Sequence, residues 1–297
     1  MALAELHLHL EGSVEPDTLR VLDPVVTDAE IAAAYAFKNF AGFIEAFKWV
    51  ALRLRSPQDY ALITAALCRR LADANITYAE ITLAAGVVLW RGQDLAAIYS
   101  AVRDAALASP VEVKWNLDSI RQFGPDLAQR VAEFAVAEKS NGVVSLGIGG
   151  DEVAGPAEWF ADVYRFARDG GLRLTAHAGE TAGPASVWSA LEIGAERIGH
   201  GIRSIDDPVL VKHLAQHKIP LEVSITSNVK TGAVASLAAH PLRKLFDAGV
   251  PITLNTDDPA IFGTTLQREF DLARLQFGFT ESELDIVRAN AWQFRFA

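Results

Sequence analysis

The sequence predicts an α/β protein built as a (β/α)8 barrel, in which eight parallel strands alternate with helices. Short apolar segments, each followed by a helical stretch, recur along the 297 residues at intervals of about 30–40 residues. Eight such repeats are the number needed to close a barrel. No low-complexity tract or Ser/Gly/Pro-rich linker interrupts them, so residues 1–297 are expected to form a single domain.

The predicted strands are short apolar segments that end near glycine, proline or a polar residue. They are Ala4–Leu10, Thr77–Ala85, Val111–Asp118, Val143–Gly149, Arg173–Ala178, Arg197–His200, Leu221–Ser227 and Pro251–Asp257. Amphipathic helices are expected between most of them, including Asp59–Ala74, Leu127–Lys139 and Trp159–Asp169.

A doubly wound open sheet is the competing architecture. Such a sheet usually has a glycine-rich phosphate-binding turn after its first strand, and residues 7–16, HLHLEGSVEP, contain none. Residues 146–151, LGIGGD, are rich in glycine but lack the G-x-G-x-x-G spacing before a helix. We interpret these glycines as room for close approach of the backbone to a ligand or a neighbouring strand. The barrel is therefore preferred.

The composition limits the partners and the compartment. Hydrophobic residues make up 51% of the chain and its net charge is −10, which disfavours binding to nucleic acid or to an anionic membrane. The single cysteine, Cys68, excludes an internal disulfide and a zinc site built from several thiolates, and we expect it to be buried. The first residues lack the pattern of a secretory signal, so a cytoplasmic location is expected.

Residues that bind metals or transfer protons end several of the predicted strands. Residues 7–11 read HLHLE, residues 177–180 read HAGE, and His200 and Asp257-Asp258 end two further strands. In a (β/α)8 barrel these carboxyl ends meet at one rim, which is where such enzymes place their active sites. The sequence therefore predicts an active site at this rim.

His7 and His9 lie two residues apart, so on a strand they point to the same side. Taken alone, they could also be two histidines at a polar strand end. With His177 and Asp257 they form a set of three imidazoles and one carboxylate, which suits zinc and leaves a position for water. Bound zinc lowers the pKa of a coordinated water to about 7.

The remaining polar residues at the rim are candidates for acid–base chemistry. Glu180 could act as a general acid or base, or as the N-terminal carboxylate of the following helix, or as both. His200 could orient or deprotonate a water, or could be a hydrogen-bonded core histidine. Two adjacent buried carboxylates are costly unless a cation neutralises them, which favours a functional role for Asp257 and Asp258. One of them would bind the metal and the other would face the substrate. The histidines at positions 213, 217 and 240 are interpreted as structural or solvated.

In this order, the motifs resemble the adenosine deaminase family of metal-dependent hydrolases, and the resemblance covers nearly the whole chain. The matching segments are HLHLEG (7–12), GIGGDE (147–152), HAGET (177–181), RIGHGI (197–202), TSNVKTG (226–232) and LNTDDP (254–259). The resemblance implies one zinc ion per chain, held by His7, His9, His177 and Asp257.

The same resemblance implies a substrate and a reaction. The substrate would be a 6-aminopurine nucleoside, hydrolysed to the 6-oxopurine with release of ammonia. Glu180 would protonate a ring nitrogen, while His200 and Asp257 would position the water. Asp258 would bond a nitrogen of the five-membered ring, and the Gly150 N–H would bond another ring nitrogen.

Residues 39–50, NFAGFIEAFKWV, resemble the helical gate that the family places over its pocket after the first strand. Phe43 and Phe47 would then cover the purine and exclude water, although an ordinary amphipathic helix gives the same pattern. Further substrate contacts are expected from His9 and Glu11.

Two features depart from the family pattern. Glu11 stands where adenosine deaminases commonly carry an aspartate that holds the ribose 5′-hydroxyl. The segment HLHLEG also occurs in adenine deaminases. A glutamate at position 11 would also fit an enzyme that acts on 6-aminodeoxyfutalosine, which is an adenosine with an extended 5′ substituent. The chain also stops at residues 294–297, so a final helix of the family is expected to be missing.

Two other readings compete with a mononuclear deaminase. A binuclear amidohydrolase typically needs a lysine on the fourth strand, and residues 143–149 contain none, while Lys114 lies on the strand before. A binding barrel that has lost catalysis predicts erosion of the ligands or of the acid, and none is seen. The sequence leaves the oligomeric state open.

Overall fold

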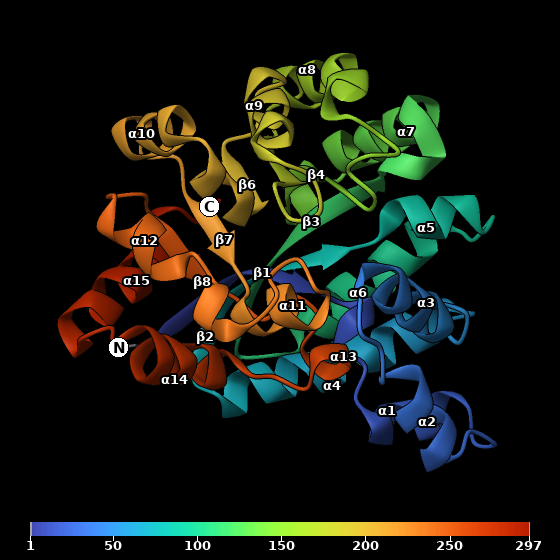
Figure 1. Ribbon diagram of the computed structural model, residues 1–297. Helices are drawn as coiled ribbons and strands as arrows, with labels where there is room; N and C mark the ends of the chain where they lie inside the picture. The colour runs from blue at the N-terminus through green and yellow to red at the C-terminus, as the bar shows by residue number, and fades with distance from the viewer. Residues whose placement is uncertain (1, 297) are drawn as a thin grey trace.

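The computed structural model describes residues 2–296 and confirms the predicted barrel (Figure 1). Its eight strands follow one another around the sheet in chain order, and each pairs in parallel with the next. The strands are β1 (Leu3–His9), β2 (Ile76–Leu83), β3 (Glu112–Ile120), β4 (Val143–Gly149), β5 (Arg173–Ala178), β6 (Arg197–His200), β7 (Leu221–Val223) and β8 (Ile252–Leu254).

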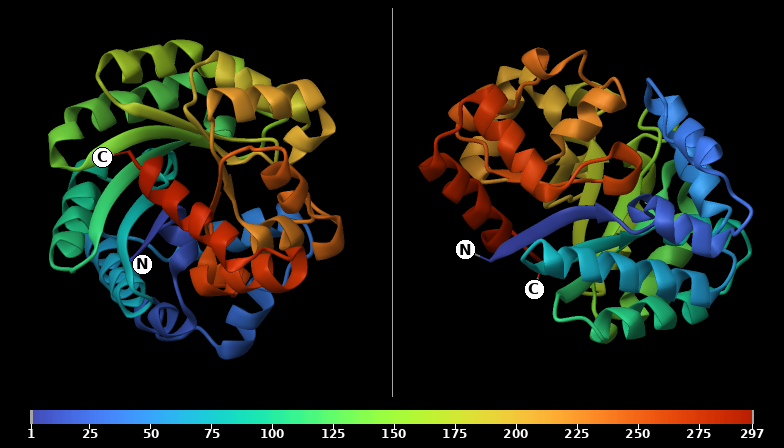
Figure 2. Two further views of the ribbon diagram at one scale, coloured as in Figure 1. Left: turned by 90° about the vertical axis from the view of Figure 1, so that its left-hand side faces the viewer. Right: turned by 90° about the horizontal axis from the view of Figure 1, so that it is seen from below.

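Helices cover the outside of the sheet (Figure 2). The α-helices are α1 (Pro16–Leu22), α2 (Asp28–Ala34), α3 (Phe40–Ala51), α4 (Pro57–Asp73), α5 (Ala85–Trp90), α6 (Leu95–Leu107), α7 (Gly124–Ala137), α8 (Ala161–Asp169), α9 (Pro184–Glu192), α10 (Pro208–His217), α11 (Ile225–Lys230), α12 (Leu242–Asp247), α13 (Pro259–Phe262), α14 (Leu266–Phe277) and α15 (Glu281–Gln293). Short 3-10 helices are η1 (Glu11–Ser13), η2 (Arg121–Phe123), η3 (Lys139–Asn141), η4 (Ala157–Phe160), η5 (Ile202–Asp206) and η6 (Leu237–Ala239).

The ring closes between the first strand and the segment that follows the last one. Leu8 pairs in parallel with Asp257 in an isolated bridge. The His9 N–H donates to the Asp257 carbonyl at 2.8 Å, and the Asp257 N–H donates to the His7 carbonyl at 3.1 Å. The hydrogen bonds that close the barrel therefore also bring three predicted metal ligands to the same place.

Helix α4 shows how local sequence fixes an element. Ser56 and Asp59 form a capping box around its first turn, and Pro57 occupies the first helical position, where its missing N–H costs nothing. The inner face of the helix packs on the sheet. Cys68 lies on this face and is buried, as predicted.

Four of the predicted strands end earlier than expected. β1 ends at His9 instead of Leu10 and β2 at Leu83 instead of Ala85, and the differences are larger in β7 and β8. β7 stops at Val223 and the chain turns at once into α11, so residues 225–227 are helical and the predicted strand Leu221–Ser227 is too long. β8 stops at Leu254 rather than at Asp257. In β7 and β8 the polar side chains that follow the strand, including Ser227 and Asp257, are buried.

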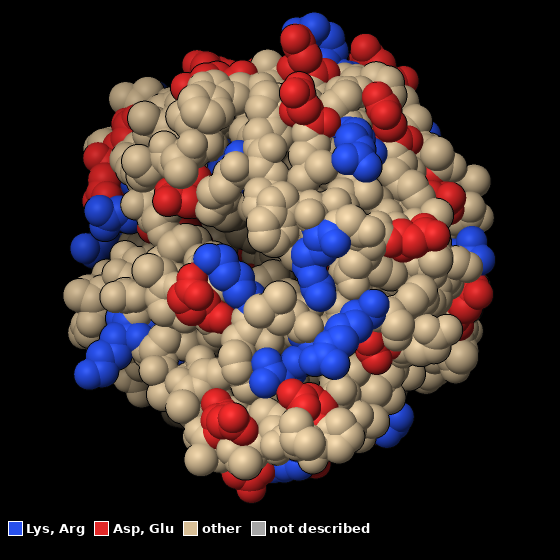
Figure 3. Space-filling model, turned by 90° about the vertical axis from the view of Figure 1, so that its right-hand side faces the viewer, with Lys and Arg blue, Asp and Glu red and all other residues tan. Residues whose placement is uncertain are grey.

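Helices α1–α3 are inserted between β1 and α4, and α3 packs against η1 and α13 at the rim. At the opposite end of the barrel, α15 lies against β8 and β1 (Figure 2). Acidic and basic side chains are interspersed over the face shown in Figure 3, around a hollow near its middle. None of the helices within residues 2–296 is both long enough and apolar enough to cross a membrane.

Candidate metal centre and active site

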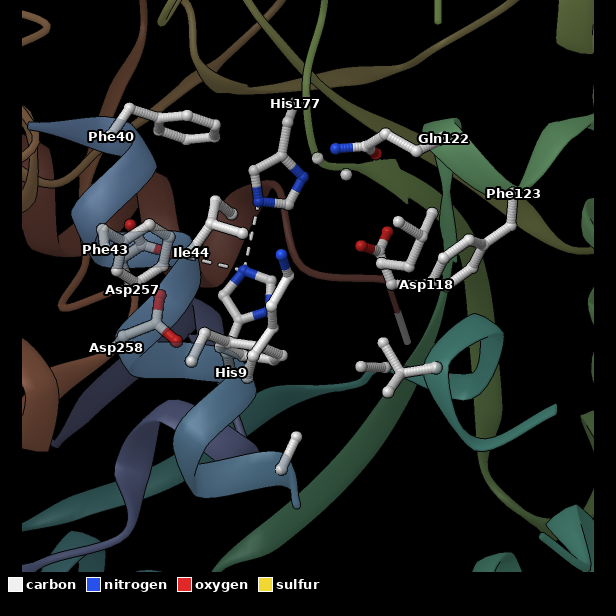
Figure 4. Close-up of a pocket in the computed structure, with 18 of the residues that line it drawn as sticks. His9, Phe40, Phe43, Ile44, Asp118, Gln122, Phe123, His177, Asp257 and Asp258 are labelled. Atoms are coloured by element: carbon white, nitrogen blue, oxygen red, sulfur yellow. Dashed lines mark hydrogen bonds and ion pairs between the residues drawn. The ribbon is translucent and has the colours of Figure 1, made fainter. Parts of the chain in front are cut away.

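The predicted metal ligands converge on one buried cluster at the carboxyl ends of the strands. Nε2 of His9 lies 3.1 Å from Nε2 of His177, and both His7 Nε2 and His9 Nε2 lie 3.3 Å from Asp257 Oδ1. Figure 4 shows His9, His177 and Asp257 facing one another at the inner end of a cavity. Each of the four predicted ligands therefore has a donor atom within 3.3 Å of a donor atom of another.

His200 belongs to the same cluster. One donor atom from each of His7, His177, His200 and Asp257 can be chosen so that all lie within 4.8 Å of one another. His200 Nε2 lies 4.0 Å from Asp257 Oδ2 and 3.6 Å from Glu180 Oε2. Proximity alone therefore does not separate His200 from the predicted ligands.

A chain of hydrogen bonds distinguishes His200 from the predicted metal ligands. The Leu242 N–H can only donate, so His240 Nδ1 accepts that bond, at 3.1 Å, and His240 carries its proton on Nε2. This proton is donated to Asn228 Oδ1 at 3.2 Å, which directs the Asn228 amide N–H toward His200 Nδ1 at 3.1 Å. The proton of neutral His200 is thus fixed on Nε2, the nitrogen that faces the cluster. His200 is set up as a hydrogen-bond donor rather than as a metal ligand.

His177 has the opposite arrangement. Its Nδ1 lies 3.2 Å from the Ile148 carbonyl, which can only accept, so Nδ1 carries the proton and Nε2 is left free. Burial lowers the pKa of His177 well below its ordinary value, and lowers the pKa values of His9 and His200 to about 4. These imidazoles are therefore neutral at neutral pH, the form in which histidine binds metals.

His7 carries the clearest sign that the cluster is built for a cation. Burial opposes its charge, but its contacts with Asp257 and Glu222 outweigh burial and raise its pKa to about 10, so a cation bound here would replace the proton on this imidazole. Its Nδ1 lies 2.8 Å from Glu222 Oε2, whereas its buried Nε2 faces Asp257 Oδ1 at 3.3 Å and makes no hydrogen bond within residues 2–296. A carboxylate on one ring nitrogen and a second nitrogen that faces the cluster without a hydrogen bond is the arrangement expected of a metal-binding histidine.

The adjacent carboxyl groups of Asp257 and Asp258 differ in charge state. Burial opposes the charge on Asp257, but His7 and the neighbouring imidazoles hold its pKa well below its usual range. Burial and the charge of Asp257 raise the pKa of Asp258 well above its usual range. Asp257 and His200 both have left-handed backbone, with φ of 64° and 63°, which side-chain-bearing residues rarely adopt and which is common at functional sites.

Glu180 lies beside this cluster, after β5. Burial raises the pKa of Glu180 well above its ordinary value, and the nearby charges of Asp257 and Glu152 add to the effect. The Thr231 hydroxyl donates to Glu180 Oε1 at 3.3 Å. Helix α9 begins only at Pro184, so Glu180 is not a carboxylate of its first turn. The raised pKa favours the protonated form of Glu180, from which it can donate a proton.

Glu152 supports Glu180, and the sequence analysis missed it. Its carboxylate accepts hydrogen bonds from the N–H groups of Gly179, Glu180 and Thr181 at 2.7, 2.9 and 2.7 Å, and from the Ser186 hydroxyl at 2.5 Å. It thus fixes the backbone that carries the acid. The segment GIGGDE contained the signal, since an acid directly after a buried strand needs a partner.

A cavity of about 500 Å³ opens from the cluster toward solvent. Its inner end is polar, and its outer wall is formed largely by aromatic and aliphatic side chains (Figure 4). The apolar lining residues include Phe40, Phe43, Ile44, Phe47, Trp90 and Phe123.

The predicted substrate-binding residues are only partly brought together. His9, Phe43, Phe47 and Gly150 line the cavity, as does Asp258. Phe43 also stacks on Phe262 with ring centroids 4.9 Å apart.

Glu11 is the exception. Its carboxylate accepts a hydrogen bond from the Ala84 N–H at 3.1 Å, and it is not among the residues that line the cavity. The Glu11 side chain therefore points toward the start of α5 rather than into the cavity.

The structure gives no support to a binuclear site. Lys114 lies near the beginning of β3, where its Nζ is 3.3 Å from Glu112 Oε1, away from the carboxyl ends of the strands. Strand β4 contains no lysine.

His213 and His217, which the sequence predicts to be structural or solvated, stack on each other on α10.

Comparison with known proteins agrees with the family resemblance of the sequence motifs. The sequence profile of the family "Adenosine deaminase" matches residues 2–297. The chain is 38% identical to the aminodeoxyfutalosine deaminase of Streptomyces avermitilis, over 99% of this chain and 86% of that protein. It is 35% identical to the adenine deaminase of Rhizobium meliloti, over 99% of this chain and 93% of that protein. A crystal structure of an amidohydrolase from Burkholderia ambifaria with bound Zn superposes with a TM-score of 0.92 at 28% identity, covering 100% of this chain and 86% of that one. The chain belongs to the adenosine deaminase family.

Proposed function

We propose that this protein catalyses the hydrolytic, zinc-dependent deamination of a 6-aminopurine nucleoside, either adenosine or an adenosine extended at its 5′ position. The products would be the 6-oxopurine nucleoside and ammonia. Membership of the family supports a deaminase of adenine- or adenosine-like substrates. The observation that carries the proposal is the position of Glu180, a buried acid with a raised pKa, beside a buried histidine–aspartate cluster at the inner end of a cavity.

The ion would be a single zinc held by His7, His9, His177 and Asp257. Three groups in this set suit a cation: the neutral imidazoles of His9 and His177, and the charged carboxylate of Asp257. Nε2 of His7, which faces Asp257, completes the set. When bound, zinc supplies a Lewis acid that makes a water molecule a stronger nucleophile at neutral pH.

The chain's own residues would manage the protons. Protonated Glu180 would donate to the ring nitrogen next to the amine-bearing carbon, which makes that carbon more electrophilic. A nitrogen of the five-membered ring also offers a lone pair, so Asp258 can bond it only as a protonated acid, and its raised pKa fits this role. His200 Nε2–H would donate a hydrogen bond that orients the incoming oxygen, and the Gly150 N–H would bond a further ring nitrogen.

The cavity favours a nucleoside over a free base. A purine bound between Glu180 and Asp258 would fill only the inner part of a cavity of about 500 Å³. The outer part, with Phe47 and Trp90, would remain for a sugar and an apolar 5′ substituent. The 38% identity to an aminodeoxyfutalosine deaminase supports the same substrate class.

Adenine is the second candidate substrate. The Rhizobium relative is named an adenine deaminase, and Glu11 does not reach the cavity to hold a 5′-hydroxyl. If adenine is the substrate, the outer part of the cavity is closed or filled by water in the working enzyme.

A substrate screen tests the proposal. Ammonia release would be measured with adenosine, 2′-deoxyadenosine, adenine, 6-aminodeoxyfutalosine and 5′-deoxy-5′-methylthioadenosine. We expect the highest kcat/KM with a 5′-extended nucleoside. A higher value for adenine would favour the second candidate, and no release from any of them would refute a deaminase of 6-aminopurines.

A further inference from the structure

Asp118 is a buried acid in the cavity that neither the predicted ligand set nor the predicted substrate contacts include. It lies near the end of β3, is 2% exposed and lines the cavity. Its Oδ1 has no hydrogen-bond partner among the residues that the structure describes. In Figure 4 its carboxyl group lies on the opposite side of the cavity from Asp258.

The neighbouring strand makes room for this side chain. A Cβ atom added to Gly147 would lie 2.5 Å from Asp118 Oδ1, and one added to Gly149 would lie 2.4 Å from Asp118 Oδ2. Neither glycine has a positive φ, so the backbone conformation does not require glycine at these positions. Both glycines of β4 are therefore needed for the space that the carboxyl group occupies.

Among residues 2–296, no side chain forms an ion pair or a hydrogen bond with the Asp118 carboxyl group in compensation. The nearby cation, Arg121, donates to the carbonyls of Gly155 and His177 at 2.7 and 2.5 Å. Within residues 2–296, Asp118 is also absent from the two groups of side chains placed to hold a metal ion, which are His7, His177, His200 and Asp257, and His9, Asp257 and Asp258. A buried carboxyl group without a donor is costly, which indicates that a donor comes from the ligand.

We propose that Asp118 is a substrate-binding residue that accepts a hydrogen bond from an O–H or N–H group on the N9 side of the purine. This inference rests on the proposed function. Asp118 pairs in register with Gly147 on β4, and Gly150, which follows directly after that strand, lines the cavity together with Asp118. A purine whose N3 bonds the Gly150 N–H, and whose N7 bonds Asp258 on the other side, directs N9 and its substituent toward β3. The donor is then either a ribose hydroxyl or the N–H of a free base, and Asp118 makes the contact that Glu11 does not reach.

Matched substrate pairs test this assignment. The pairs are adenosine with 2′-deoxyadenosine, adenosine with 3′-deoxyadenosine, and adenine with 9-methyladenine. The second member of each pair lacks one hydrogen-bond donor, which is a ribose hydroxyl in the first two pairs and the N9–H in the third. In the wild type, loss of the bonded donor should lower kcat/KM about tenfold to hundredfold in one pair, since the acceptor is a buried carboxylate. Asp118→Ala should turn over both members of that pair at nearly equal rates. A response in a nucleoside pair would identify a ribose hydroxyl as the donor, and a response in the adenine pair would identify the N–H of the base.

Further variants keep the test informative if Asp118→Ala does not fold. Asp118→Asn keeps the shape and removes the charge, and Gly147→Ala places a methyl group against the carboxyl oxygen and should displace it. Both should reduce the discrimination within the responding pair while the metal content stays unchanged. Lys114→Gln, at the amino end of the same strand, is the control and should keep the wild-type ratio.

The inference fails if no pair shows discrimination in the wild type. It also fails if the Asp118 variants keep the wild-type ratio while losing activity equally on all substrates, which would indicate a structural role. A wild-type protein that deaminates none of these compounds would refute the proposed function itself, so the two failures are distinguishable.

Discussion

His7 Nδ1 lies 2.8 Å from Glu222 Oε2, which connects a predicted metal ligand to a buried chain of charged groups inside the barrel. Glu222 Oε1 lies 2.6 Å from Arg197 Nε, and the Arg197 guanidinium also pairs with Glu80. The guanidinium packs 3.6 Å from the centre of the Phe296 ring near the other end of the chain. The orientation of His7 therefore depends on side chains that extend from the rim to the opposite end of the barrel.

Glu222→Gln should weaken metal binding. The amide can still accept a bond from His7 but no longer supplies a charge that makes the imidazole a stronger ligand, so the metal dissociation constant should rise about tenfold to hundredfold. Competition with a chelating dye measures this. Glu196→Gln, which alters an exposed ion pair with Arg173, serves as the control and should bind metal as the wild type does. Equal affinities in both variants would show that Glu222 does not tune the site.

Glu180→Gln should leave the metal in place and reduce turnover. The amide has the same shape but cannot transfer a proton to the purine ring, and general-acid contributions are about a hundredfold to ten-thousandfold in kcat. Metal content and steady-state rates of the same preparation provide the measurement. A rate close to that of the wild type would remove Glu180 from the acid role.

Phe47→Ala should raise KM more than it lowers kcat. Phe47 lines the cavity from α3, so its loss should remove apolar contact with the substrate without removing the acid or a predicted ligand. We expect KM to rise by about tenfold for a 5′-extended nucleoside, from the apolar area lost. Phe166→Ala, an exposed aromatic on α8, is the matched control. A change confined to kcat would argue against a covering role for α3.

Glu11→Gln should change how stability depends on pH. Burial raises the pKa of Glu11 from 4.5 to about 7, so the folded chain holds this proton to a higher pH than the unfolded chain does. The stability linked to Glu11 is then complete below about pH 4.5 and is lost as the pH rises through about 7. Glutamine does not titrate, so the stability of the variant relative to the wild type should increase over that range, by up to about 3 kcal/mol. Urea unfolding at a series of pH values measures the difference, and a difference that is independent of pH would contradict it.

The sequence predicted the barrel because its strands are read from local patterns. The alternation of apolar and helical segments needs no long-range information, and two histidines two residues apart on a strand must face the same side. The placement of His177 near His7 and His9 followed from the rule that strand ends meet at one rim. Closure of the barrel by the bridge between Leu8 and Asp257 confirmed that geometry.

The roles of several other site residues depend on contacts between segments that lie far apart in the sequence. Asp118 looked like an ordinary strand end until the register placed it opposite Gly147. His240 was interpreted as structural or solvated, and its influence on His200 requires Asn228, whose position is set by α11, a helix where a strand was expected. The side-chain direction of Glu11 was set by the turn after β1, which residue type alone does not determine.

The metal content of the purified chain tests the central claim most directly. If His7, His9, His177 and Asp257 form one site, elemental analysis should find one zinc ion per chain, and His177→Ala should lose both the ion and the deaminase activity. A folded chain that releases ammonia from a 6-aminopurine without bound metal, or that binds two ions per chain, would contradict the account.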